Sequence, residues 1–271
     1  MSSRRTALIT GASSGIGEAF ATVFASEGFD LVITARREAR LRALAARLEH
    51  TYGRRVEVIS CDLADPNGPA MLCAAIDDRG IAIDALVNDA GFGAVGTYTR
   101  SSWAVHQAML HVMVMGPAEL TYRLLPGMIE RGYGRIINVA SFAGLVAAPA
   151  GTLYGAAKSF LINFSQSLAR EVAGHGIHVT AICPGLTRSE FHDVPATRAT
   201  VAHLPQWLWM DASTVAVQGF QAVMDGTPVY VNGRINRALV TLFRIVPLPL
   251  VTAAGRRFLR LYKSRSALAS S

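Results

Sequence analysis

The stretch TGASSGIG, from Thr10 to Gly17, follows a short apolar run at residues 6–10 and opens a segment with helical periodicity at residues 16–26. A strand that turns directly into a helix exposes the first helix amides and the positive end of its dipole. Glycines at this turn let a pyrophosphate approach the backbone. The alternative is an ordinary tight turn, which the position and spacing of the glycines disfavour. The expected phosphate contacts are Gly11, Ser13, Ser14, Gly15, Ile16 and Gly17.

Short apolar runs alternate with longer amphipathic segments along most of the chain. Strands that are apolar on both faces and joined by helix-length connections predict a parallel sheet covered by helices on both faces. No linker or repeat divides this pattern, so we expect one doubly wound α/β domain with its ligand crevice at the carboxyl ends of the strands. The predicted strands are 6–10, 30–34, 56–60, 85–88, 135–139, 178–182 and 228–231, and the predicted helices are 16–26, 38–49, 69–78, 101–130, 153–172 and 213–224.

The charge of the chain is concentrated at one end. The 271 residues are 51% hydrophobic and 17% charged, which excludes disorder and allows a substantial core. Eight of the 26 basic residues and no Asp or Glu lie between residues 226 and 271, so the rest of the chain holds 18 basic and 19 acidic residues. Because the body is near neutral and the basic end lacks the regular interleaving of aromatic with basic residues that stacks bases, we do not expect a nucleic-acid partner.

Cysteine usage and the chain start indicate a cytoplasmic protein. Cys61, Cys73 and Cys183 are odd in number and widely spaced, which fits reduced thiols better than disulfides or a zinc site. We therefore expect no metal. The strand-like run at residues 6–10 leaves no room for a signal peptide before it. The late apolar stretch at residues 238–255 contains an arginine and two prolines, so it is a poor membrane span.

Two arginines, Arg36 and Arg37, follow the second predicted strand. An acidic residue about twenty residues beyond the glycines would hydrogen-bond the ribose 2′-hydroxyl of NAD(H). No acid stands here, and guanidinium groups suit a 2′-phosphate. We therefore expect NADP(H) in preference to NAD(H), the alternative being two solvated arginines at the start of a surface helix.

Ser141, Tyr154 and Lys158 form a catalytic constellation. Tyr154 and Lys158 are four residues apart and share one face of a helix, so the ammonium is expected to lower the tyrosine pKa from about 10. Tyr154 could then exchange a proton with a carbonyl oxygen, and Ser141 could hydrogen-bond that oxygen as charge develops on it. Alone, the two residues would be better explained as a core tyrosine and a surface lysine. Together with Ser141 they indicate catalysis.

In this order and spacing the motifs resemble the classical short-chain dehydrogenase/reductase family over roughly residues 6–232. The turn has the family's TGxxxGxG form, Tyr154 and Lys158 form YxxxK, and NDAG at residues 88–91 resembles NNAG with Asp89 as the second residue. The resemblance implies a Rossmann-type domain that interconverts a ketone and a secondary alcohol, with Asp62 near the adenine and Lys158 on the nicotinamide ribose. The further cofactor contacts that we expect are Leu63, Asn88, Ala90, Gly91, Tyr154, Pro184, Gly185 and Thr187.

Met113 departs from the family pattern. The family usually carries Asn in a run like VNxxG, where it helps to hold a water in the proton relay to the lysine. Here the run at residues 112–116 is VMVMG, and methionine has no amide to hold that water. On a regular helix His111 points about 200° away from Met113, so it does not substitute. We expect weakened or rerouted proton delivery in an active enzyme.

The substrate side is apolar and aromatic. The segment from residue 186 to 210 would cover the nicotinamide and substrate, and its composition predicts a hydrophobic or acyl-type substrate such as a 3-oxoacyl group. Steroid or xenobiotic carbonyls are one alternative, and a catalytically weak NADP(H)-sensing protein on the same fold is another. Trp207 and Trp209 could instead pack into the domain or a subunit contact. The candidate substrate residues are Phe92, Phe142, Phe191 and Trp207.

Residues 233–271 extend past the catalytic domain at residues 1–232. This extension resembles the C-terminal segment of reductases that act on acyl or other lipid-like carbonyls. We expect it to pack over the substrate pocket with its arginines in solvent. Peripheral contact with an anionic membrane, where each nearby charge contributes on the order of 1 kcal/mol, is the alternative. Since dimers and tetramers are usual in the family, we also expect a homo-oligomer.

Overall fold

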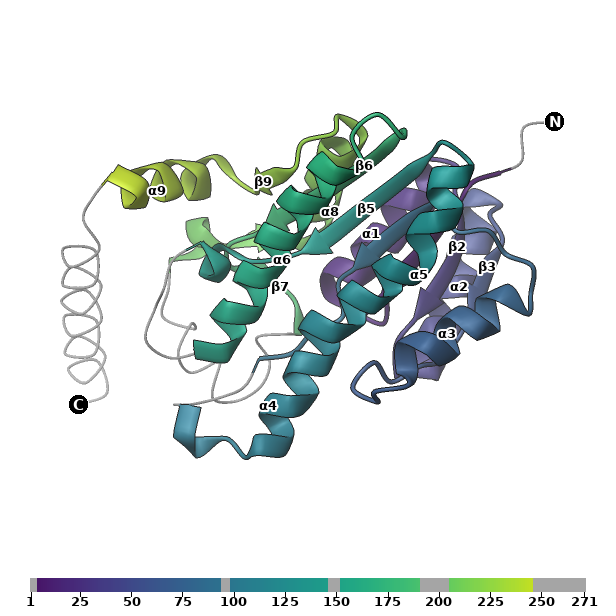
Figure 1. Ribbon diagram of the computed structural model, residues 1–271, viewed down its shortest axis with the longest axis horizontal. Coiled ribbons are helices and arrows are strands. Elements are labelled where there is room, and N and C mark those ends of the chain that lie inside the picture. Colours follow the sequence, from purple (N-terminus) through teal and green to yellow (C-terminus); the bar gives the residue numbers. More distant parts are fainter. Residues whose placement is uncertain (1–3, 94–97, 146–151, 191–204, 246–271) are drawn as a thin grey trace.

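The computed structural model describes residues 4–93, 98–145, 152–190 and 205–245, which are built around a seven-stranded sheet (Figure 1). All neighbouring strands are parallel, in the order β3-β2-β1-β4-β5-β6-β9. The predicted α/β fold is confirmed, although the strand expected at residues 56–60 ends two residues earlier. The strands are β1 (Thr6–Thr10), β2 (Asp30–Thr34), β3 (Val56–Val58), β4 (Ala85–Asn88), β5 (Gly134–Val139), β6 (Ile177–Cys183) and β9 (Val229–Val231).

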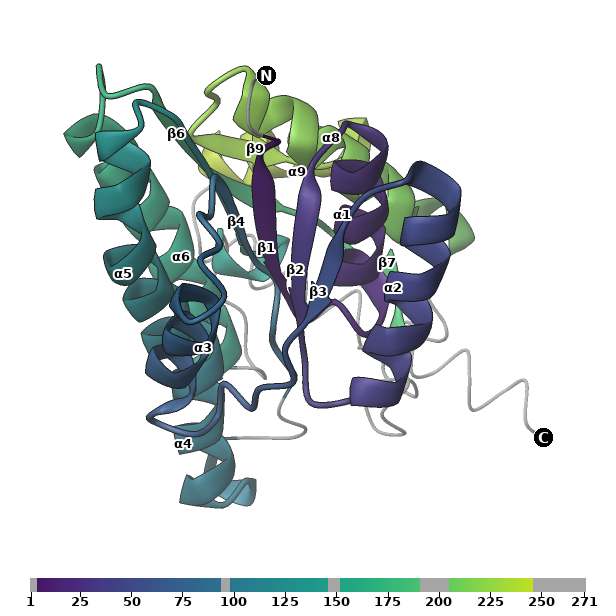
Figure 2. The same cartoon turned by 90° about the vertical axis from the view of Figure 1, so that its right-hand side faces the viewer.

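Helices cover both faces of the sheet (Figure 2). Successive strand side chains point to opposite faces, so Ile9 and Leu8 of β1 lie in two separate hydrophobic cores, and both are fully buried. None of the helices in the described part of the chain is long and apolar enough to cross a membrane. One face carries α1 (Gly15–Ser26), α2 (Glu38–Tyr52) and α8 (Ala212–Met224), and the other carries α3 (Gly68–Asp77), α4 (Trp103–Leu110), α5 (Gly116–Glu130) and α6 (Thr152–Glu171).

The order of the strands places a ligand crevice beside β1. This strand pairs with β2 on one side and β4 on the other, so the direction of winding reverses there, and ligands bind at the carboxyl ends of strands at such a point. An aromatic cluster fixes α1, whose N-terminus faces that edge. The Phe24 ring lies 5.0 Å from the rings of both Phe29 and Phe220, in edge-to-face contacts.

The single helical stretch predicted over residues 101–130 is divided into three parts. A π-helical turn, η2 (His111–Met115), connects α4 to α5. Such turns are frequent at functional sites, and five residues are too few for the change of helical period to be visible in the sequence. Met113, the residue that departs from the family pattern, is fully buried within this turn.

The carboxyl-terminal third contains elements that the sequence pattern does not predict. Two short strands, β7 (Thr187–Arg188) and β8 (Met210–Asp211), pair in parallel. The helix α9 (Arg234–Ile245) projects from the β9 edge of the sheet (Figure 1). Asn236 in its first turn packs against Gly185, where an added Cβ would lie 2.5 Å from Asn236 Nδ2. Residues 246–271 lie outside the described part, so the division of the chain after residue 232 stays a prediction.

Candidate active site

The glycine-rich turn packs tightly against the segment that follows β4. Gly11 has a φ of +70°, and a Cβ there would lie 2.9 Å from the Ala90 backbone nitrogen. A Cβ at Gly17 would lie 2.5 Å from the Gly11 carbonyl oxygen and 2.7 Å from Asp89 Oδ2. Any larger residue at these two positions would force the turn and β4 apart. The backbone amides at the start of α1 therefore stay close to the crevice, as phosphate binding requires.

A cleft of about 260 Å³ opens at the carboxyl ends of β1, β2 and β4. It brings together predicted residues from four separate loops, and this lining fits the adenosine and pyrophosphate of a nicotinamide dinucleotide. Sequence reasoning missed Thr34, Ala35, Cys61, Ala64 and Val112, which also line it. The predicted residues in the lining are Gly11, Ser13, Ser14, Arg36, Arg37, Asp62, Leu63, Ala90, Gly91 and Phe92.

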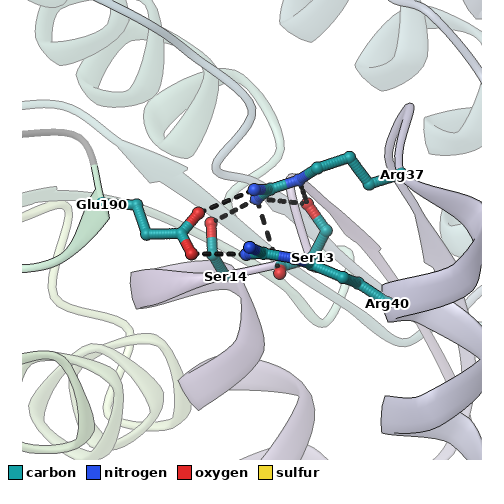
Figure 3. A network of polar contacts seen from close by, with 5 residues as sticks. All are labelled: Ser13, Ser14, Arg37, Arg40 and Glu190. Carbon is teal, nitrogen blue, oxygen red and sulfur yellow. Dashed lines mark hydrogen bonds and ion pairs between the residues drawn. The ribbon is translucent and has the colours of Figure 1, made fainter. Parts of the chain in front are cut away.

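Arg37 joins the glycine-rich turn to a distant segment (Figure 3). Its Nε donates to Ser13 Oγ at 3.1 Å, and its Nη2 donates to Ser14 Oγ at 2.8 Å. Its Nη1 contacts Glu190 Oε2 at 2.7 Å, and the other Glu190 oxygen pairs with Arg40. Arg40 and Glu190 were not predicted as site residues, because no local motif marks a contact across 153 positions of sequence.

Ser141, Tyr154 and Lys158 meet at the carboxyl end of β5. Ser141 follows the strand and accepts a hydrogen bond from the Ala143 amide at 3.2 Å, which begins the short helix η3 (Phe142–Gly144). Tyr154 and Lys158 lie one turn apart on α6, and the Lys158 Nζ donates to the Val139 carbonyl of β5 at 2.7 Å. The predicted constellation is therefore assembled from a strand end and the helix packed beside it.

The expected lowering of the Tyr154 pKa is wrong for the free protein. Burial raises this pKa above 10, a side-chain hydrogen bond with Ser141 opposes the rise, and the Asp89 charge adds to it. Lys158 Nζ lies 5.7 Å from the centre of the Tyr154 ring and is hydrogen-bonded to Val139. The spacing of four residues does bring the two side chains to one face of α6, but burial of the tyrosine sets the direction of its pKa shift.

Asp89 places a carboxyl group in this site. The residue is half-buried, its carboxylate accepts a hydrogen bond from the Gly17 amide, and burial raises its pKa to about 7 against the opposing effects of Lys158 and that amide. Burial lowers the pKa of Lys158 to about 8, and Asp89 opposes this shift. The sequence reveals Asp89 as a departure from NNAG, but only the fold shows that its charge and that of Lys158 act on each other.

A buried amide chain ties the catalytic helix to the sheet. Asn88 Nδ2 donates to Asn138 Oδ1 at 2.8 Å, and Asn138 Nδ2 donates to Ser165 Oγ at 2.8 Å. Ser165 in turn donates to the Leu161 carbonyl of α6 at 2.7 Å. These contacts fix the helix that carries Tyr154 and Lys158. Asn88 lies outside the lining of the cleft, and its contact with the cofactor stays a prediction.

The segment after β6 lies beside the catalytic serine. The Phe142 amide donates to the Pro184 carbonyl at 2.9 Å, and the buried Thr187 Oγ1 donates to the Gly185 carbonyl at 3.2 Å. Trp207, in the short helix η5 (Gln206–Leu208), is 64% exposed. Phe191 lies outside the described residues. Within those residues, no cluster of His, Cys, Asp and Glu is suited to hold a metal ion.

The comparisons with known proteins place this chain in a family. The family model for short chain dehydrogenase matches residues 5–198. The chain belongs to the short-chain dehydrogenase family. It is therefore an NAD(P)-dependent oxidoreductase that acts on CH–OH groups and the corresponding carbonyls, and the family resemblance of its motifs is confirmed.

Its relatives in this family differ in the substrates that their names state. The chain is 38% identical over 188 residues to a serine 3-dehydrogenase of Agrobacterium fabrum, covering 69% of this chain and 73% of the relative. It is 33% identical over 181 residues to the ketoacyl reductase HetN of a Nostoc species, covering 67% and 63%. A short-chain dehydrogenase from Sphingobium yanoikuyae, solved with NADPH, superimposes with a TM-score of 0.77 at 30% identity, covering 98% of this chain and 96% of that chain.

Proposed function

We propose that this chain interconverts a ketone and a secondary alcohol with NADP(H) as its cofactor, on a hydrophobic or acyl-type substrate such as a 3-oxoacyl group. The observation that carries the proposal is the hydrogen bond between Ser141 and Tyr154, one helical turn from Lys158 and at the end of β5. A hydroxyl pair of this kind, with a buried cation beside it, suits a carbonyl oxygen that gains negative charge.

When bound, the nicotinamide supplies the hydride for reduction or accepts it in oxidation. Ser141 donates a hydrogen bond to the carbonyl oxygen and orients it. Tyr154 gives its phenolic proton to that oxygen, and the burial that raises its pKa keeps the proton on Tyr154 at neutral pH. Lys158 then stabilises the phenolate by its charge. In this protonation state Tyr154 can act as the proton donor that reduction of a carbonyl requires.

The preference for NADP(H) is supported by Arg36 and Arg37. Both line the cleft directly after β2, and no acidic side chain is present in its lining at the position that would bind a 2′-hydroxyl. A planar guanidinium forms paired hydrogen bonds with a phosphate. Structural neighbours have been solved with NADPH and with NAD, so the preference rests on the two arginines.

The hydrophobic substrate is supported by the apolar side of the site. Phe92 follows the turn after β4 and packs against the hydrophobic core that contains Met113. Phe142 directly follows the catalytic Ser141, and Trp207 lies exposed on η5. Apolar walls near a few convergent polar groups are typical of sites for hydrophobic ligands. Steroid or xenobiotic carbonyls fit the same observations.

The test is a panel of ketones graded by chain length, reduced with NADPH and with NADH in parallel. We expect kcat/KM to rise with chain length and to be higher with NADPH. Tyr154→Phe removes only the phenolic hydroxyl, so it should lower kcat by a factor of at least about 100 while cofactor binding is retained. Equal rates for short and long ketones would contradict the hydrophobic substrate, and an active Tyr154→Phe variant would contradict the role of Tyr154.

We also propose that the chain forms a homo-oligomer. Large apolar side chains are exposed along α4, η2 and α5, where Trp103 is 62%, Met115 55% and Tyr122 79% exposed. Apolar side chains that are exposed along neighbouring helices are candidates for a contact between subunits. Light scattering coupled to gel filtration gives the mass in solution, and a monomer mass of 28.9 kDa would contradict the proposal.

A further inference from the structure

Glu190 lies between two arginines at the edge of the proposed cofactor site (Figure 3). Its Oε2 contacts Arg37 Nη1 at 2.7 Å, and its Oε1 pairs with Arg40 Nη1. The two guanidinium groups come from the start of α2, while Glu190 comes from the segment after β7. The side chains of Arg37, Arg40 and Glu190 are 44%, 51% and 41% exposed, so solvent and a ligand can reach them.

The same Arg37 guanidinium contacts the glycine-rich turn through Ser13 and Ser14. The segment that carries Glu190 also touches this turn, because a Cβ added at Gly15 would lie 2.9 Å from Ser189 Cβ. Arg37 lines the cleft together with Ser13 and Ser14. The Glu190 carboxylate therefore holds one nitrogen of an arginine that also lines the cleft in which we expect the cofactor 2′-phosphate.

Two anions cannot share these donors without mutual repulsion. The paired arginines lower the pKa of Glu190 to about 2, so its carboxylate is charged throughout the working pH range of an enzyme. A phosphate monoester carries between one and two negative charges near pH 7 and offers three acceptor oxygens. If it takes the Arg37 donors, Glu190 must give them up. An exposed ion pair contributes little stability, so this exchange is feasible at ordinary ligand affinities.

We propose that Glu190 is a residue that determines cofactor specificity, by competing with the 2′-phosphate of NADP(H) for Arg37 and Arg40. This inference rests on the proposed use of NADP(H), and it adds Arg40 to the phosphate site. NAD(H) has no 2′-phosphate, so its binding does not require the displacement of Glu190. Glu190 thus reduces the advantage of NADP(H) over NAD(H) that the arginines alone would give.

The experiment is calorimetric titration of NADP⁺ and NAD⁺ into the full chain and its variants. Glu190→Gln keeps the size of the side chain and removes its charge, so we expect NADP⁺ to bind about two- to fivefold tighter, with the affinity for NAD⁺ unchanged. Arg40→Gln should weaken NADP⁺ alone. The matched control is Glu38→Gln. Glu38 lies in the first turn of α2, as Arg40 does, but its carboxylate pairs with Arg42. This variant should bind both dinucleotides with the affinities of the unaltered chain.

The competition is overturned if Glu190→Gln binds NADP⁺ no tighter than the unaltered chain, which would mean that Glu190 merely positions Arg37. It is also overturned if this variant or the control tightens both dinucleotides equally. A further variant, Arg37→Gln, tests the proposed preference for NADP(H) separately from the role of Glu190.

If the unaltered chain binds NADP⁺ and NAD⁺ with equal affinity and Arg37→Gln changes neither affinity, the proposed preference for NADP(H) is wrong. The inference about Glu190 is then wrong as well. Thermal unfolding of each variant confirms that it is folded.

Discussion

Asp89 and Lys158 are two ionisable groups in one water-poor site, and their pKa values are shifted toward each other. Burial disfavours both charged forms, while their mutual attraction and the Gly17 amide favour the charges. The result is a carboxyl group with a pKa of about 7 beside an ammonium with a pKa of about 8. Because both groups titrate near neutral pH, the free energy of unfolding should change with pH in that range. Exposed carboxyl groups do not contribute to this change, since they are already ionised there.

Asp89→Asn is expected to stabilise the protein at neutral and alkaline pH. In the unfolded chain this carboxyl ionises near pH 4, and in the folded protein its pKa is about 7. The unfolded state therefore loses its proton first as pH rises, and the free energy of unfolding falls between about pH 4 and pH 7. Removing this group should raise that free energy by about 1–3 kcal/mol at pH 8 and by less at pH 5.

Denaturant unfolding at pH 5 and pH 8 measures this difference. Asp225→Asn is a suitable control, because Asp225 is exposed at the end of α8 and accepts a hydrogen bond only from Gln221 among the contacts of the described residues. Its effect should be small and equal at both pH values. A loss of stability in Asp89→Asn at pH 8, or the same gain at both pH values, would contradict the raised pKa of Asp89.

At the scale of elements, the seven strands could be predicted because strands buried on both faces appear as apolar runs. Other elements could not. β7 and β8 have two residues each, too few for a period of two to be visible. The π-helical turn at His111–Met115 has only five residues, too few for a change of helical period to be visible in the sequence. The contact between Glu190 and Arg37 joins the segment after β7 to the residue before α2, and no spacing in the sequence indicates it.

The π-helical turn directs Met113 against the loop after β4. A Cβ added at Gly91 would lie 3.2 Å from the Met113 sulfur, so this side chain packs under residues that line the cleft. Met113→Asn would place an amide there, where the family resemblance implies a relay to Lys158. We expect a higher turnover of ketone with NADPH, together with a loss of stability of about 1–3 kcal/mol, since a polar group is buried.

Turnover must be measured per folded molecule to separate these two effects. Met113→Leu is the matched control, because it preserves the apolar volume and supplies no amide. It should leave turnover near that of the unaltered chain. A fall in turnover for Met113→Asn, with fold and cofactor binding intact, would contradict the expectation that Met113 weakens the proton relay to Lys158.

At the scale of the whole molecule, charge is divided between a near-neutral body and a basic end. Eight of the 26 basic residues follow residue 225 without a single acid. Within the described part, Arg237 contacts the Tyr230 hydroxyl at 3.0 Å, and Asn236 packs against Gly185 in the turn after β6. The start of the extension is therefore attached near the substrate side of the site, which favours a role as a cover over a role as a detached anchor.

Ending the chain after Asn232 tests these two roles together. Loss of an apolar cover should raise KM for a long-chain ketone by roughly fivefold or more and leave the affinity for NADP⁺ unchanged.

The full and shortened chains should sediment equally with anionic vesicles. A full-length variant with Arg256, Arg257, Arg260 and Lys263 changed to Gln serves as control, because it removes charge and keeps the apolar segment. If the full chain alone sediments with anionic vesicles, and this control does not, the basic end is a membrane contact, since electrostatic attraction to anionic lipid requires those charges.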